Sequence, residues 1–297
     1  MGLKTALSQF THAKIFYDQP MKKHTGFRVG GVAKYYAEVD SLYGLNQLIV
    51  LAKKYKVPYK VLGNGTNVLV SDKGYNGIIV NVKKLNDVFF KRDQVRAMAG
   101  AQLDKLVKFA FDHRLSGMEC LVGIPATVGG AIVMNAGAFG HNIAEKVVCV
   151  ETLENGKIKF YDKEDCKFGY RTSRFQKKGE VIISATFSFE DGDREQMQSQ
   201  MKSYLEIRKS LQPCGNSCGS VFKNPKPVAA GALIDRAGLK GFSIGCAKVS
   251  ERHGNFIITN GKGSAEDVFR LINSVKYKVK EKFNVELVEE VEFLGEF

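Results

Sequence analysis

The chain has 297 residues, of which 44% are hydrophobic and 25% charged, proportions that exclude a disordered protein. Its 44 lysines and arginines against 31 acidic residues give a net charge of +13, which favours an anionic partner without identifying it. There is no apolar run near the ~20 residues of a membrane helix and no export signal, so we expect a cytoplasmic protein with no membrane partner.

The first half of the chain alternates helical and extended patterns. Apolar residues at helical spacing predict helices over 42–55 and 103–111, and Gly117 lies beyond the second, where a left-handed cap is expected. Short apolar runs between turn residues predict strands over 57–62, 68–70, 78–80 and 95–99. This alternation is typical of an α+β or α/β domain.

From residue 147 the pattern becomes richer in strands. Extended runs over 147–153 and 158–161 flank Asn155-Gly156, a pair that predicts a hairpin, and a long strand follows over 181–189. A polar helix is expected after Asp193, ending near Pro213, and we place a domain boundary there.

The last 90 or so residues form a second predicted unit, which is long enough for its own core. Its expected strands are 220–222, 247–250, 256–259 and 285–294. A helix is predicted from Ser264, because Asp267 stands at capping-box spacing before an apolar stripe.

The six cysteines do not indicate disulfides or a metal site. They are thinly spread in a chain without an export signal, so we expect them to be reduced. Cys214 and Cys218 form a C-x3-C pair, but no second cysteine or histidine pair follows at zinc-finger spacing. No metal is therefore predicted.

Basic residues are dispersed rather than gathered on one predicted face. The densest groups, 22–24, 171–178 and 276–282, lie far apart in the sequence. A nucleic-acid binder is expected to concentrate its positive charge and to interleave aromatic residues. A phosphorylated small molecule fits these charges at least as well, and we expect no nucleic-acid partner.

Two glycine-rich segments are the strongest candidates for a ligand site. Residues 62–72 contain Gly63 and Gly65 beside Asn64, Thr66 and Asn67, and such a loop can turn backbone N–H groups toward a pyrophosphate. The third glycine of a Rossmann fingerprint is missing, and a strand-like run follows where that motif has a helix. The alternative interpretation is a tight turn between two strands.

The second segment, residues 117–140, has six glycines among apolar residues and almost no charge. Such a backbone permits close approach of a flat ligand. The alternative is a glycine-rich crossing of the core, although a packed core gains more from side chains than from their absence. We favour a cofactor wall.

Together these segments resemble the UDP-N-acetylenolpyruvoylglucosamine reductase family of flavoenzymes. The resemblance covers nearly the whole chain and rests also on residues 24–31, 168–175, 219–225, 237–241, 249–256 and 289–291. It implies an α+β fold, with a two-lobed vanillyl-alcohol-oxidase-like (PCMH-type) FAD-binding domain over 1–205, the lobes spanning about 1–85 and 86–205. A smaller α+β substrate-binding domain over 206–297 would follow.

The resemblance also implies a reaction and its residues. NADPH would reduce FAD, and the enolpyruvyl ether of UDP-N-acetylglucosamine would then be reduced to UDP-N-acetylmuramate for peptidoglycan synthesis. Ser220 would donate the proton, and Arg171 and Glu290 would bind the carboxylate end. The cofactor-binding set would be Arg28, Gly63, Asn64, Gly65, Thr66, Asn67, Gly123, Ile124, Pro125, Thr127, Val128, Gly129, Asn135 and Gly137.

Substrate binding is expected from Asn224, Lys223 and His253, with Arg236, Lys240 and Arg252 as further candidates for phosphate groups. The chain resembles the shorter family members, which lack the inserted loop whose tyrosine covers the substrate. Along the predicted final strand, alternation sends Glu289 and Glu290 to opposite faces, and a solvent-facing role suits Glu289 better. The sequence leaves the oligomeric state open, with a monomer as one possibility.

Two other functions stay open at this stage. An FAD-dependent oxidase of a small alcohol could use the same scaffold, although it has no evident use for Ser220, Asn224 and Glu290 in combination. A basic nucleic-acid binder without a cofactor would be colourless and its binding would depend steeply on salt.

Overall fold

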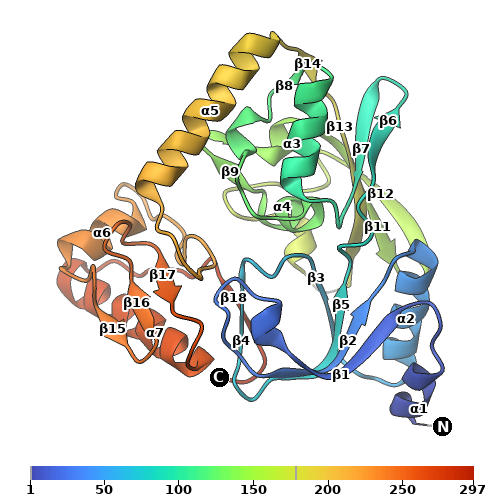
Figure 1. The fold of residues 1–297 in the computed structure, drawn as a ribbon, viewed down its shortest axis with the longest axis horizontal. Helices are drawn as coiled ribbons and strands as arrows, with labels where there is room; N and C mark the ends of the chain where they lie inside the picture. Colours follow the sequence, from blue (N-terminus) through green and yellow to red (C-terminus); the bar gives the residue numbers. More distant parts are fainter. Residues whose placement is uncertain (1, 178) are drawn as a thin grey trace. The chain divides into compact units, whose positions relative to one another are not determined.

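The structure, a computed structural model, describes residues 2–177 and 179–297. The helices are α1 (Leu3–Ser8), α2 (Leu42–Lys54), α3 (Leu103–Asp112), α4 (Val128–Met134), α5 (Arg194–Leu211), α6 (Ala230–Arg236) and α7 (Ala265–Phe283), with 3-10 turns η1 (Met21–Lys23), η2 (Glu119–Leu121), η3 (Ile143–Glu145) and η4 (Arg174–Gln176). Figure 1 follows these elements along the chain.

The strands are mostly short. They are β1 (Lys14–Pro20), β2 (Val32–Glu38), β3 (Tyr59–Leu62), β4 (Val68–Val70), β5 (Tyr75–Asn81), β6 (Val88–Lys91), β7 (Gln94–Met98), β8 (Leu115–Ser116), β9 (Gly137–Ala138), β10 (His141–Asn142), β11 (Val147–Glu154), β12 (Lys157–Asp162), β13 (Val181–Phe187), β14 (Glu190–Asp191), β15 (Ser243–Ile244), β16 (Ala247–Val249), β17 (Ile257–Thr259) and β18 (Glu292–Leu294).

Two compact units interleave along the chain. Unit 1 contains the residues up to Phe16 together with 36–63 and 78–208, and unit 2 contains 17–35, 64–77 and 209–297. The two units therefore do not coincide with the linear domains predicted over 1–205 and 206–297. The reason is that unit 2 recruits two early segments, which supply Phe27, Val29 and Leu69 to its core.

Unit 1 is built on an antiparallel five-stranded sheet of order β12-β11-β13-β7-β6. The predicted Asn155-Gly156 turn joins β11 to β12, and both residues have the positive φ, 49° and 78°, that this hairpin turn requires. Helices α3 and α4 lie on one face of the sheet (Figure 1) and bury Leu103, Ala131 and Ile132 in a shared core.

A second sheet has the order β1-β2-β5-β3, and the division between the units falls within β1, β2 and β5. The following helix, α2, matches the predicted stripe, with Leu45, Leu48 and Ala52 buried. Its first turn is capped by the Ser41 hydroxyl, which accepts a hydrogen bond from Gly44 N.

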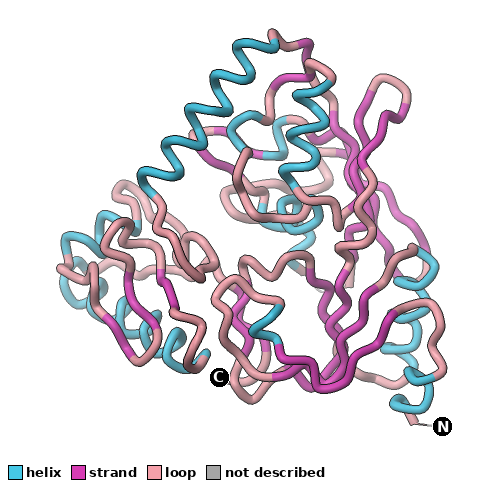
Figure 2. Tube along the Cα trace, in the orientation of Figure 1, coloured by secondary structure: helices cyan, strands magenta, loops and turns pink. Residues whose placement is uncertain are grey.

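Unit 2 combines a three-stranded sheet, β15-β16-β17, with α6 and α7. Much of the rest of this unit is irregular chain between short elements (Figure 2). Several contacts bind its early segments to its late ones; among them, β4 pairs in parallel with β18, and the Thr259 hydroxyl donates to the Phe27 carbonyl. The predicted capping box is present, since Ser264 and Asp267 bond each other's backbone N–H.

Three expected elements are wrong. Residues 220–222 form no strand and make only isolated bridges, while of residues 285–294 only β18 is extended in a ladder. The left-handed residue after α3 is Arg114, with φ 57°, so the helix ends before Gly117 can cap it. The helix α4 was not expected within the glycine-rich segment.

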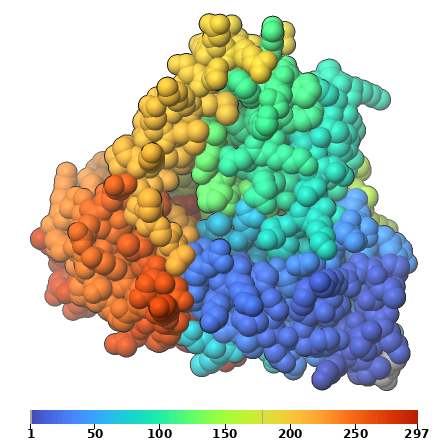
Figure 3. All heavy atoms as spheres, viewed as in Figure 1, coloured from blue at the N-terminus to red at the C-terminus, as the bar shows by residue number. Residues whose placement is uncertain are grey.

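Helix α5 is predominantly polar, and Met197 is its buried residue. Its exposed length is visible in yellow in Figure 3. No helix of the described residues is sufficiently long and apolar to span a bilayer.

Candidate functional site

The two glycine-rich segments meet within unit 1 at Gly63 and Thr127. Thr127 is buried, and its hydroxyl accepts a hydrogen bond from Gly130 N at the start of α4. A Cβ on Gly63 would stand 2.2 Å from that hydroxyl oxygen, so only glycine fits against the threonine. The two glycine-rich segments, which are separate in the sequence, therefore pack against each other at this point.

Helix α4 presents different sides to the core and to the surface. Gly129 packs on Ala99, whose Cβ would lie 2.9 Å from an added Cβ. Gly130 is exposed, and an added Cβ would have only the Thr127 oxygen, at 3.5 Å, within 4 Å. Gly123 and Pro125 are exposed as well. Residues 123–130 themselves carry no charged side chain, and such a backbone suits a planar ring such as isoalloxazine.

Arg171 lies in unit 1 at a tight turn. Its backbone has φ 52°, the left-handed region that non-glycine residues rarely adopt. Its Nη2 donates a 2.8 Å hydrogen bond to the carbonyl of Gly137, at the end of the glycine-rich segment. The predicted carboxylate ligand therefore lies beside the predicted cofactor wall.

Arg208, which is not among the residues predicted from the sequence, contacts the same wall from α5. Its Nη2 donates to the Cys120 carbonyl at 3.1 Å, and its guanidinium lies 5.1 Å from the centre of the Phe139 ring, which stacks on Tyr204. Burial lowers the pKa of Arg208, and the like charge of Arg171 acts in the same direction. Its place on the stripe of Met197 and Tyr204, four residues after the tyrosine, could have revealed it.

The predicted pyrophosphate loop spans residues 63–67, of which Gly63 belongs to unit 1 and residues 64–67 belong to unit 2. Gly65 has φ 66°, and a Cβ there would stand 2.0 Å from the His24 carbonyl oxygen, so the loop needs glycine. Arg28 is exposed, with φ 57°, between the buried Phe27 and Val29. Asn67 Nδ2 donates to the Glu290 carbonyl at 2.9 Å. The loop is thus joined to a predicted catalytic residue in the same unit.

Ser220 and Glu290 lie on neighbouring backbone segments of unit 2. The N–H of Glu290 donates to the Val221 carbonyl at 2.8 Å, one residue from Ser220. Ser220 bridges Phe256, and Val221 N donates to the Asn255 carbonyl at 2.9 Å. Both side chains are partly buried. The structure therefore brings together these two members of the predicted catalytic set.

Glu289 does not fit the solvent-facing role that alternation suggested. Its Oε1 accepts from Lys276 Nζ at 2.6 Å, and its side chain is 22% exposed. The residue bridges Phe222 in irregular chain, so the two-residue alternation of a strand does not apply there.

The predicted substrate ligands have different surroundings. Asn224 is exposed, and its Oδ1 accepts from Ala230 N at the start of α6. Lys223 is partly buried, and its backbone N–H bonds the Val288 carbonyl. His253 Nδ1 accepts from Asn255 N at 3.2 Å, and burial followed by the charge of Lys240 lowers the pKa of His253.

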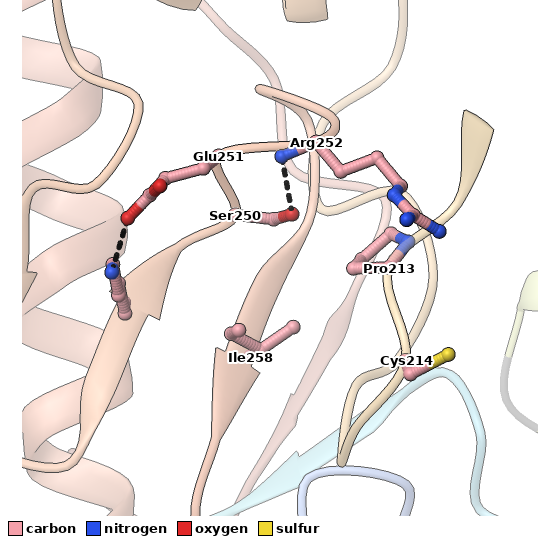
Figure 4. A pocket seen from close by; sticks show the side chains of 7 residues that line it. Pro213, Cys214, Ser250, Glu251, Arg252 and Ile258 are labelled. Carbon is pink, nitrogen blue, oxygen red and sulfur yellow. Dashed lines mark hydrogen bonds and ion pairs between the residues drawn. The ribbon is translucent and has the colours of Figure 1, made fainter. Parts of the chain in front are cut away.

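A surface hollow of about 280 Å³ opens in unit 2. Figure 4 shows its lining, which consists of Pro213, Cys214, Lys248, Ser250, Glu251, Arg252 and Ile258. Lys248 pairs with Glu251, and Arg252 Nη1 donates to the carbonyls of Lys209 and Gln212. The side chains of Lys248 and Arg252 thus already bond groups of the protein. The hollow therefore does not support a phosphate site at Arg252.

Cys214 and Cys218 face different surroundings. Cys214 is exposed, whereas the Cys218 thiol is buried against the Val68 carbonyl, and burial raises the pKa of Cys218 to about 12. Within residues 2–177 and 179–297, no group of three or more histidine, cysteine or acidic side chains is arranged to hold a metal ion.

Comparison with known proteins identifies both parts of the chain. Residues 33–158 match an FAD binding domain, and residues 211–294 match the C-terminal domain of UDP-N-acetylenolpyruvoylglucosamine reductase. The reductase of Caldanaerobacter subterraneus subsp. tengcongensis is 44% identical over 95% of this chain and 94% of its own length.

The chain belongs to the UDP-N-acetylenolpyruvoylglucosamine reductase family. A Streptococcus thermophilus member is 42% identical, covering 95% of this chain and 93% of its own. The crystal structure of the Thermus caldophilus reductase superposes with a TM-score of 0.81 at 33% identity, over 95% of this chain and 99% of that one. The predicted family and the α+β fold with an FAD-binding domain are confirmed.

Proposed function

We propose that this chain catalyses the NADPH-dependent reduction of UDP-N-acetylglucosamine enolpyruvate to UDP-N-acetylmuramate, with FAD as its bound cofactor. The supporting observation is that one chain joins the FAD binding domain to the family's C-terminal domain, which holds Ser220 and Glu290 on hydrogen-bonded segments. An alcohol oxidase has no evident use for Ser220, Asn224 and Glu290 in this combination.

The residues fit the implied cofactor. The exposed backbone of Gly123 and Gly130 would border the flavin ring, and the loop containing Gly65 and Asn67 would hold its pyrophosphate. When bound, FAD would supply the hydride that converts the enolpyruvyl double bond to a single bond.

The side chains of the protein would supply the remaining requirements of the reaction. Arg171 would form a planar fork on the substrate carboxylate and stabilise the negative charge that grows there, with Arg208 as a second positive charge on the same unit. Glu290 would bind the same end of the substrate. Ser220 Oγ would deliver a proton to the carbon next to the one that accepts hydride, so that hydride and proton together saturate the double bond.

The remaining polar residues of unit 2 are proposed for the nucleotide. Asn224, Lys223 and His253 would contact the uridine diphosphate portion, where the chain's positive charge also favours binding. We propose that the protein acts in the cytoplasm, without nucleic acid.

The two half-reactions can be separated in an anaerobic stopped-flow experiment. NADPH should bleach the flavin absorbance of the purified holoenzyme, and the enolpyruvyl nucleotide should then restore it with formation of the lactyl ether. A flavin that NADPH leaves oxidised, but that a small alcohol reduces and oxygen reoxidises, would contradict the proposal and favour an oxidase.

A further inference from the structure

The turn that carries Arg171 is fastened on both sides to the end of α4. Asn135 Nδ2 donates to the Gly169 carbonyl at 3.0 Å, and the Ser173 hydroxyl donates to the Val133 carbonyl at 2.8 Å. Asn135 and Ser173 are 7% and 6% exposed. Both bonds are therefore largely shielded from water, where a lost partner costs the most.

Between these two bonds the backbone is tightly folded. Gly169 and Thr172 exchange N–H···O bonds of 3.0 and 3.3 Å, so only Tyr170 and Arg171 form the turn. Arg171 has φ 52°, a strained conformation that persists only where the surroundings impose it. From this position its guanidinium reaches the Gly137 carbonyl, two residues beyond Asn135.

Asn135 is suited to this task by its backbone as well as by its amide. It ends α4 in the left-handed conformation, with φ 44°, which asparagine tolerates better than most residues. Its Oδ1 accepts from Ala144 N at 3.3 Å, so one buried amide joins α4, the Arg171 turn and η3. The sequence analysis predicted Asn135 as a flavin ligand, but these two contacts indicate a different task.

We propose that Asn135 and Ser173 are positioning residues that fix the Arg171 guanidinium relative to the α4 wall. The inference rests on the proposed role of Arg171 as the carboxylate ligand. Hydride transfer requires the carboxylate end and the ring to be aligned, and a displacement of about 1 Å can slow a reaction roughly a hundredfold. Asn135 and Ser173 would act through Arg171 and would not touch the substrate.

Asn135→Asp is the sharpest variant, because it keeps an Oδ1 acceptor for Ala144 and tolerance of left-handed backbone, yet removes the donor to Gly169. Ser173→Ala removes the second bond with a smaller change. Asn155→Asp is the matched control: Asn155 is also left-handed, with φ 49°, and lies exposed in unit 1 at the β11–β12 turn.

Each holoenzyme is tested for FAD content, unfolding midpoint and both half-reactions. For Asn135→Asp and Ser173→Ala we expect the enolpyruvyl nucleotide to oxidise the reduced flavin about 10- to 100-fold more slowly than in the parent. The FAD content and the rate at which NADPH reduces the flavin should stay within about twofold of the parent. Asn155→Asp should match the parent throughout. Equal losses in both half-reactions, or lost FAD, would overturn the proposal and indicate a flavin ligand or a structural residue.

A double-mutant cycle separates the two levels of inference. With Arg171 replaced by alanine, adding Asn135→Asp should slow the substrate half-reaction by less than about twofold further, because the positioned group is gone. If the double variant instead lost the product of the two separate fold-losses, the positioning role of Asn135 would be contradicted. If Arg171→Ala alone left that half-reaction unchanged, the proposed role of Arg171 would fail, and the positioning role with it. Normal rates in Asn135→Asp beside an impaired Arg171→Ala would refute the positioning role alone.

Discussion

The side-chain amide of Asn255 satisfies both backbone groups of Phe222. Its Oδ1 accepts from Phe222 N at 2.9 Å, and its Nδ2 donates to the Phe222 carbonyl at 2.8 Å. Asn255 is 2% exposed. A buried side chain thus performs the pairing that a neighbouring strand would otherwise provide, two residues from Ser220.

Replacing Asn255 by alanine should lower the free energy of unfolding by about 2–4 kcal/mol, because two buried backbone groups lose their partners. Chemical denaturation of the holoenzyme measures the change. Asn260→Ala, an exposed asparagine of the same unit, should cost about 0.5 kcal/mol or less. Similar losses in both variants would argue against the special role of the buried amide.

Ser220→Ala should leave reduction of the flavin by NADPH nearly intact and slow its oxidation by the enolpyruvyl nucleotide by about a hundredfold or more, the usual scale for a positioned acid. Stopped-flow absorbance of each half-reaction tests this. Equal slowing of both would remove Ser220 from the proton-donating role.

Adjacent glycines of α4 should respond oppositely to alanine. Gly130→Ala should raise the free energy of unfolding of the apoprotein by about 0.5–1 kcal/mol, since the added methyl has room and helix propensity improves. It should also weaken FAD retention, because the methyl projects from the proposed wall.

Gly129→Ala should instead lower that free energy, because its Cβ would meet Ala99 at 2.9 Å. Apoprotein denaturation and FAD titration give the two quantities. Unchanged FAD affinity in Gly130→Ala would place the flavin elsewhere.

Arg208→Met should raise KM for the enolpyruvyl nucleotide by about tenfold or more, the scale of a lost hydrogen bond to a charged group, while keeping most of the side chain's packing. Arg208→Lys should recover part of the loss because it restores the charge. Steady-state kinetics at two salt concentrations measures both variants. An unchanged KM in Arg208→Met would show that this charge does not face the substrate.

Stability should depend on pH through His253. Burial, followed by Lys240, lowers the pKa of His253 from its ordinary value of 6.5 in the folded protein. Below pH 6.5 the unfolded chain binds a proton that folded His253 does not, so its contribution to stability is full above that pH and is lost as the pH falls through the folded pKa.

His253→Asn preserves an acceptor for Asn255 N and should flatten this dependence. Thermal unfolding between pH 5 and 8 compares the two proteins. The same slope in both proteins would exclude His253 as its source. For this comparison, all samples need the same FAD loading, because bound ligand itself shifts the midpoint.

Local chemistry in the sequence was sufficient to predict the helices and turns that it controls. The capping box of Ser264 and the Asn155-Gly156 hairpin depend only on neighbouring residues, and both are present. Helix α4 was missed because its two glycines weaken helix propensity, while Thr127 and Asn135 define its ends. Residues 220–222 were expected to be a strand, but a distant side chain, Asn255, bonds their backbone.

The site was predictable to a lesser extent. Glycine spacing indicates the segments around Gly63 and Thr127 as candidates, whereas the contact between them is tertiary. Only the family resemblance indicates Ser220 and Glu290, since neither stands out chemically in the sequence. Arg208 lies outside every matching motif. Helical spacing places it on the stripe of Met197 and Tyr204, but its contact with the glycine wall is tertiary.

The parallel pairing of β4 with β18 has a consequence for how the protein is made. Residues 68–70 are synthesised long before their partners, residues 292–294. Leu69 therefore cannot reach its native pairing until residues 292–294 have left the ribosome. A fragment released before that point would have an unfinished second unit, however well its first unit had folded.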